Sequence, residues 1–83
     1  MADEILAHLE AAGYRAEETG HATRWELASG TSVLWVVVWP KTIQVHAFRP
    51  EDAPRWTARF DRTAPEAAVV AFLQAIEEEM SRG

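Results

Sequence analysis

The chain has 83 residues, of which 48% are hydrophobic and eight are aromatic, and it carries a formal net charge of −5 and no cysteine. This length allows one core, so we predict a single α+β domain over residues 1–83. Without cysteine the chain offers no disulfide, no thiolate metal ligand and no cysteine nucleophile. Asp3 and Glu4 make the start acidic where a signal peptide is basic, so we expect a cytoplasmic protein.

The charge is unevenly distributed along the chain. Residues 22–62 contain six bases and four acids, whereas the two flanking segments together contain two bases and nine acids. Local charge rather than net charge governs encounters with a partner, and the overall acidity disfavours a general binder of polyanions. The acidic flanks are typical of solvated helix faces.

A short helix is predicted over residues 4–12, because apolar residues recur there at helical spacing. Gly13 follows at the position where a left-handed residue ends a helix. Tyr14 then comes next in the chain, and its contact with Leu9 is the one that usually accompanies a Schellman C-cap.

Four strands are expected next. Residues 15–21 have no period and are interpreted as a connection or an edge segment. The predicted strands cover residues 23–28, 31–39, 43–48 and 55–60, each with alternating or continuous apolar residues. The run from Val33 to Trp39 is apolar at every position and marks the central strand.

The final helix is predicted over residues 64–80. Thr63 and Glu66 fit a capping box, in which each side chain accepts a hydrogen bond from the other's backbone N–H. One apolar stripe then consists of Val69, Phe72, Leu73, Ile76 and Met80. We therefore expect a four-stranded antiparallel meander with an N-terminal and a C-terminal helix on one face, in the order α-β-β-β-β-α.

Loop lengths predict which residues share a face of this sheet. A two-residue loop at residues 29–30 and an even loop at residues 40–41 agree with a six-residue loop at residues 49–54. Together they predict an inner face of Trp25, Leu27, Leu34, Val36, Val38, Ile43, Val45, Ala47, Trp56, Ala58 and Phe60. Because Pro40 does not suit the usual two-residue turns, an odd loop there remains an alternative, and it would turn Trp35 and Trp39 inward.

The opposite side of the sheet, which we call the outer face, is left uncovered by the predicted helices. It is predicted to contain Val33, Trp35, Val37 and Trp39 with Gln44, His46 and Phe48, framed by Arg24, Arg55 and Arg59. An uncovered patch with three large aromatic residues is typical of an interaction site. We therefore predict these ten residues as a binding surface.

Three functions are considered for the outer face. Protein association, as a homodimer or with another protein, is favoured because tryptophan and arginine are typical of interface hot spots. Binding of single-stranded nucleic acid is the alternative, since aromatic side chains stack bases and arginines contact phosphates. An enzyme is the least favoured function: His8, His21 and His46 lack metal-ligand spacing, so we expect no catalytic residue, no metal and no cofactor.

A family resemblance is carried by the C-terminal part of the chain. The segments are Trp56-Thr57-Ala58-Arg59-Phe60, Thr63-Ala64-Pro65-Glu66 and Val69-Val70-Ala71-Phe72-Leu73. They resemble the C-terminal half of an actinobacterial family of small domains, with a Trp-x-Ala-x-Phe strand followed by a Thr-Pro-x-Glu helix start. That family has no assigned activity, so the resemblance implies a cytoplasmic strand-strand-helix module and adds no catalytic or binding residue.

Overall fold

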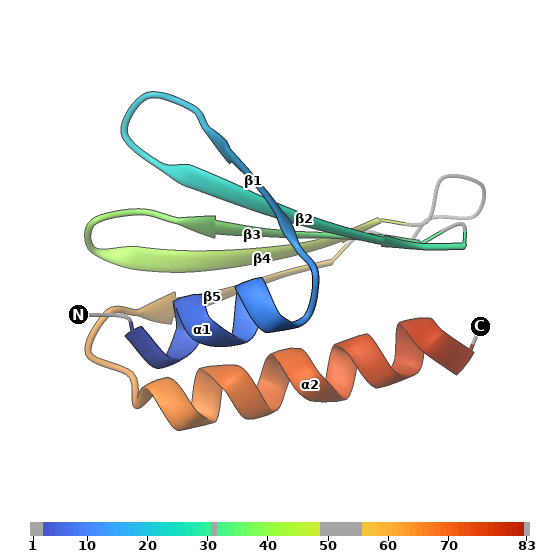
Figure 1. The fold of residues 1–83 in the computed structure, drawn as a ribbon. Coiled ribbons are helices and arrows are strands. Elements are labelled where there is room, and N and C mark those ends of the chain that lie inside the picture. The colour runs from blue at the N-terminus through green and yellow to red at the C-terminus, as the bar shows by residue number, and fades with distance from the viewer. Residues whose placement is uncertain (1–2, 31, 49–55, 83) are drawn as a thin grey trace.

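The computed structural model describes residues 3–30, 32–48 and 56–82 of the chain. The elements are α1 (Asp3–Ala11), β1 (Arg15–Glu18), β2 (Thr23–Ser29), β3 (Ser32–Val38), β4 (Thr42–Phe48), β5 (Trp56–Asp61) and α2 (Glu66–Arg82). The strands form one antiparallel sheet in the order β1-β2-β3-β4-β5. Both helices lie on one side of it, and the other side has no covering element among the described residues (Figure 1). The predicted α+β class is confirmed.

The predicted number of strands is wrong, because the sheet has five strands. The additional strand is β1, which pairs with β2 along the edge of the sheet. Its sequence, RAEE, has no apolar alternation, and all four side chains are exposed. The side chains of β1 carry little strand signal, and the strand is formed by backbone pairing with β2.

The end of α1 confirms the predicted Schellman motif. Gly13 has φ 89°, and its N–H donates to the C=O of Glu10 at 3.2 Å. The N–H of Tyr14 donates to the C=O of Leu9 at 3.1 Å. This stop turns the chain sharply into β1 and buries Tyr14, which is 6% exposed.

The predicted capping box at the start of α2 is wrong. The Thr63 hydroxyl donates to Asp61 Oδ1 at 3.0 Å, and α2 begins at Glu66. The Glu66 carboxylate instead accepts the N–H groups of Glu4 and Ile5 in α1, at 2.8 and 3.3 Å. Because the two helices begin at the same end of the sheet (Figure 1), Glu66 caps the neighbouring helix rather than its own.

Two of the three predicted strand registers are confirmed. Val36 lies opposite Val45, and Val45 lies opposite Ala58, as the loop lengths predicted. The loop at residues 40–41 has an even length, since the N–H of Trp39 donates to the C=O of Thr42 at 2.9 Å. The alternative with Trp35 on the inner face is therefore excluded.

The predicted register between β2 and β3 is wrong by two residues. Trp25 pairs with Val36 rather than Leu34, and Ser29 pairs with Ser32. Gly30, with φ 60°, is therefore the first residue of the turn, where primed turns require a positive φ. A shift of two residues keeps every side chain on its own face, so the predicted inner face is retained.

The core lies between the inner face and the helices. Its most completely buried side chains are Ile5, Leu9, Leu34, Val36, Ile43, Val45, Val69 and Leu73. Trp56 also belongs to the inner face, but it lies at the sheet edge and is 39% exposed. Its ring meets the edge of the Phe72 ring at a centroid distance of 6.0 Å. The helices therefore cover the centre of the inner face better than its β5 edge.

Candidate interaction surface

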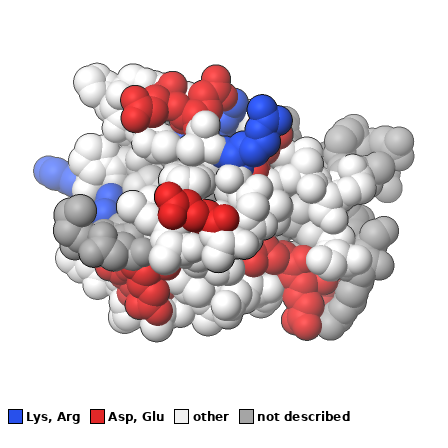
Figure 2. Space-filling view, viewed as in Figure 1, with Lys and Arg blue, Asp and Glu red and all other residues white. Residues whose placement is uncertain are grey.

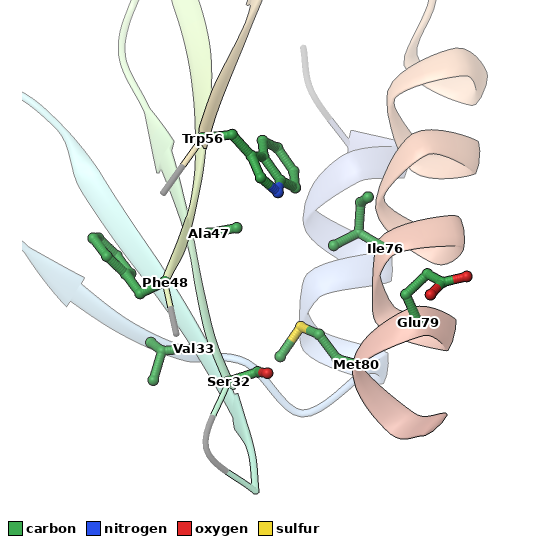
Figure 3. Close-up of a pocket in the computed structure, with 8 residues that line it drawn as sticks. All are labelled: Ser32, Val33, Ala47, Phe48, Trp56, Ile76, Glu79 and Met80. Carbon is green, nitrogen blue, oxygen red and sulfur yellow. The ribbon is translucent and has the colours of Figure 1, made fainter. Parts of the chain in front are cut away.

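The described residues predicted for the outer face do lie on the side of the sheet opposite the helices. Figure 3 shows the alternation directly: Ala47 and Trp56 point toward α2, whereas Val33 and Phe48 project from the other side. Every one of these outer-face residues is half-buried or exposed. Arg55 lies outside the described residues.

Trp35 is the centre of the outer face, and its ring is covered by neighbours. The Arg24 guanidinium carbon lies 4.5 Å from the centroid of the ring. Phe48 meets the same ring edge-on, with the two centroids 4.7 Å apart. Cation–π and aromatic contacts therefore hold three side chains from β2, β3 and β4 together without help from a helix.

Arg24 is itself held in place from the edge strand. Its guanidinium donates a hydrogen bond to Glu17 Oε1, with which it forms an ion pair. Glu17 and Arg24 are direct partners in the pairing of β1 with β2. The strand that sequence analysis did not assign thus positions the arginine that covers Trp35.

His46 lies beside Trp35 in the same row of the sheet, with Thr57 on its other side. Its Nδ1 is 3.1 Å from Thr57 Oγ1, and its Nε2 is 3.4 Å from Gln44 Oε1. Both ring nitrogens are therefore engaged by neutral side chains of the outer face.

The rim of the outer face is electrically balanced. The register assigns six described charged residues to this side, namely Arg15, Arg24 and Arg59 with Glu17, Glu26 and Asp61. Hydrogen bonds from the backbone and hydroxyl of Thr63 hold the pKa of Asp61 below its ordinary value. Figure 2 shows acidic side chains over the helical layer, and acids beside bases at the β1 end of the sheet. Most of the described acidic residues therefore lie away from the outer face.

Trp39 lies one residue beyond β3 and is 36% exposed. It borders a shallow depression together with Thr42 and Gln44 of β4. The Arg62 guanidinium donates to the Trp39 carbonyl at 2.7 Å, which fixes the backbone at this end of the sheet. Trp39 thus extends the outer face toward the turn between β3 and β4.

A separate cleft of about 320 Å³ lies between the sheet and the second half of α2 (Figure 3). Trp56 and Ala47 form one wall, and Ile76 and Met80 form the other. Glu79 is the only ionisable side chain among the described residues that line it. The side chains that line the cleft are thus mostly apolar, and the described ones include no acid and base pair.

A half-buried polar cluster in the helical layer was missed by sequence analysis. Glu77 Oε2 lies 2.8 Å from His8 Nε2 and accepts a hydrogen bond of 2.5 Å from the Tyr14 hydroxyl. The His8 side chain is 13% exposed, so little of it faces water. Burial, followed by the hydrogen bond and the charge of Glu77, raises the pKa of Tyr14 above its ordinary value. Glu77 is distant in sequence from His8 and Tyr14, so no local pattern predicts the contact.

The part of the chain that the structure describes contains neither a cluster of metal ligands nor a membrane-spanning helix. Within residues 3–30, 32–48 and 56–82, no three His, Asp or Glu side chains gather as ligands for a metal ion. Neither helix in this part of the chain is both long and apolar enough to cross a membrane. Comparison of the chain with models of protein families, with curated proteins and with solved structures finds no match.

Proposed function

We propose that this protein is an association module that forms a homodimer by packing its outer face against that of a second copy. The observation that carries the proposal is an uncovered sheet face with an apolar centre, formed by Val33, Trp35, Val37 and Phe48. Apolar patches of this kind, rimmed by polar residues, usually mark interfaces. Trp35 and Arg24 are of the residue types that dominate interface energetics.

A second copy fits this face because of its charge balance. In a two-fold interface the same surface meets itself, so a face with one sign of charge repels its partner. The outer face carries equal numbers of described acids and bases, whereas the molecule as a whole carries −5. Two copies therefore meet with the least repulsion through their outer faces.

The edges of the sheet are poorer surfaces for association. β1 has four residues, three of them charged, and all four are exposed. β5 carries Arg59 and Asp61 on the opposite edge. Short and charged edge strands discourage further pairing of strands. Association by the face is thus favoured over extension of the sheet.

The size of the face predicts a modest affinity. Five strands about 4.8 Å apart, with residues about 3.3 Å apart, give a projected area of roughly 500 Å² per copy. This is at the small end of specific interfaces, so we expect a dissociation constant in the micromolar range.

Single-stranded nucleic acid is a less favoured partner of the same face. Arg24 covers the ring of Trp35 and Phe48 meets its edge, so this ring does not offer a free surface on which a base can stack. The balanced rim also gives little attraction for phosphates. Fluorescence quenching by an oligonucleotide that decreases with salt would favour this alternative.

Sedimentation equilibrium over a range of protein concentrations tests the homodimer. We expect the wild type to dimerise and Val37→Lys to remain monomeric, because the variant places a charge at the apolar centre of the interface. Ala75→Lys is the matched control, since it adds the same charge at an exposed position of α2 and should dimerise like the wild type. A wild type that stays monomeric at roughly 100 micromolar, well above a micromolar dissociation constant, contradicts the proposal, as does a Val37→Lys variant that dimerises normally.

A further inference from the structure

We propose that the homodimer is sensitive to pH through His46, whose protonation weakens the association of the two outer faces. This inference rests on the proposed function, because it concerns the same surface. Histidine is the side chain whose charge changes most readily between about pH 5 and 8. Among the described residues it is the one histidine on the outer face: His8 belongs to the helical layer, and His21 lies in the exposed turn between β1 and β2.

The position of His46 places it inside the proposed interface. It is half-buried in the single chain, and its direct neighbours across the sheet are Trp35 and Thr57. Trp35 is the centre of the apolar patch, so a copy that covers Trp35 covers the imidazole as well. Packing of the two faces therefore removes the water that solvates the ring.

The neutral imidazole is satisfied by the outer face alone. Its Nε2–H can donate to Gln44 Oε1, and its Nδ1 can accept from the Thr57 hydroxyl, at 3.4 and 3.1 Å. In this form the ring brings no charge into the interface. Burial of a neutral group whose hydrogen bonds are made costs little.

The protonated imidazole has no carboxylate as a hydrogen-bond partner among the described residues. Of the charged groups that share its face, Arg59 on β5 and Arg24 on β2 have the same sign, and Arg24 already engages Glu17 on β1. Glu26 on β2 is separated from His46 by Trp35 in the same row, and Arg15 on β1 is its direct pairing partner. Burial of the imidazolium is thus not offset by a neighbouring charge.

The direction of the effect follows from linkage. If the imidazolium is less favourable in the dimer than in the monomer, protons bind more tightly to the monomer, and a fall in pH promotes dissociation. The symmetry of the dimer makes each dissociation involve two copies of His46. We expect the dissociation constant to rise at least tenfold between about pH 7.5 and pH 5.5.

Sedimentation equilibrium at these two pH values, at constant ionic strength, tests the inference. The wild type and His21→Gln should both show the rise in dissociation constant, whereas His46→Gln should dimerise equally at both pH values. Glutamine keeps a donor and an acceptor for Gln44 and Thr57 but cannot be protonated. If His46→Gln fails to dimerise at the higher pH, His46→Thr takes its place as an uncharged residue that favours strands.

The outcomes separate this inference from the proposed function. A wild type that is monomeric at both pH values overturns the homodimer and the inference with it. A wild-type dimer with the same dissociation constant at both pH values overturns only the role of His46. If the dissociation constant still depends on pH in the His46 variants, that role is also overturned.

Discussion

The two faces of the sheet are formed by the same five strands but are stabilised in different ways. On the inner face, Leu34, Val36 and Val45 are completely buried because α1 and α2 lie across them. On the outer face, side chains cover one another: Arg24 lies over Trp35, and Phe48 meets the Trp35 edge. The inner face depends on segments distant in sequence, whereas the outer face depends only on neighbouring strands.

This difference separates folding from association. Replacement of an inner residue leaves a cavity that the helices fill incompletely. Replacement of an outer residue by a smaller one leaves a space that is open to solvent and no enclosed cavity. It therefore lowers the free energy of unfolding less. The outer face is therefore free to be shaped by a partner, which is consistent with the proposed homodimer.

Adjacent valines of β3 provide the sharpest test of this comparison. Val36→Ala should lower the free energy of unfolding by about 2 kcal/mol, because Val36 is 0% exposed and its methyl groups leave a cavity. Val37→Ala makes the same chemical change on the outer face and should cost below about 1 kcal/mol. Urea denaturation, followed by circular dichroism at a protein concentration too low for dimerisation, measures both. Equal costs would contradict the distinction between the faces.

Tyr14, which packs in the core, should make the stability of the fold depend on pH in the alkaline range. The pKa of Tyr14 is raised in the folded protein by burial and by Glu77, so its contribution to stability is present below the ordinary tyrosine pKa of about 10 and is lost as the pH rises above it. The wild type should thus lose stability above about pH 10. Tyr14→Phe should lose less over the same range, although it starts about 1 kcal/mol less stable because one hydrogen bond is missing.

Tyr14 is the only tyrosine in the chain, which makes this prediction directly observable. Tyrosinate absorbance should appear together with unfolding during an alkaline titration. Its appearance in the folded protein near the ordinary pKa would contradict burial of the Tyr14 hydroxyl against Glu77.

Sequence patterns predicted the faces well because alternation and loop parity are local properties. Residues 42–48 alternate, whereas the continuously apolar residues 33–39 were assigned to faces by loop parity. An error of two residues in the β2–β3 register left every side chain on its predicted side. The features that were missed depend on tertiary contact. β1 is formed by pairing with β2. The Glu66 carboxylate accepts hydrogen bonds from the start of α1 and does not form the expected capping box.

The same reasoning explains what was missed in the candidate site. Its residues could be named from strand alternation and loop parity, but its internal contacts could not. No local pattern reveals that Glu17, in a segment without periodicity, holds Arg24 over Trp35. Of the three large aromatic residues predicted for the outer face, Trp35 and Phe48 are half-buried, whereas Trp39 is 36% exposed.

The smallest predicted effect concerns this arginine. Arg24→Lys keeps the positive charge but removes the planar guanidinium that lies over the indole, so the free energy of unfolding should fall by about 0.5–1 kcal/mol. The indole N–H of Trp35 is buried, and its hydrogen exchange, followed by NMR, should become faster in the variant. Arg59→Lys is the matched control, because it makes the same change at an exposed position of the same face. If the two variants exchange the Trp35 N–H at the same rate as the wild type, Arg24 does not protect this ring, and the outer face presents Trp35 directly to a partner.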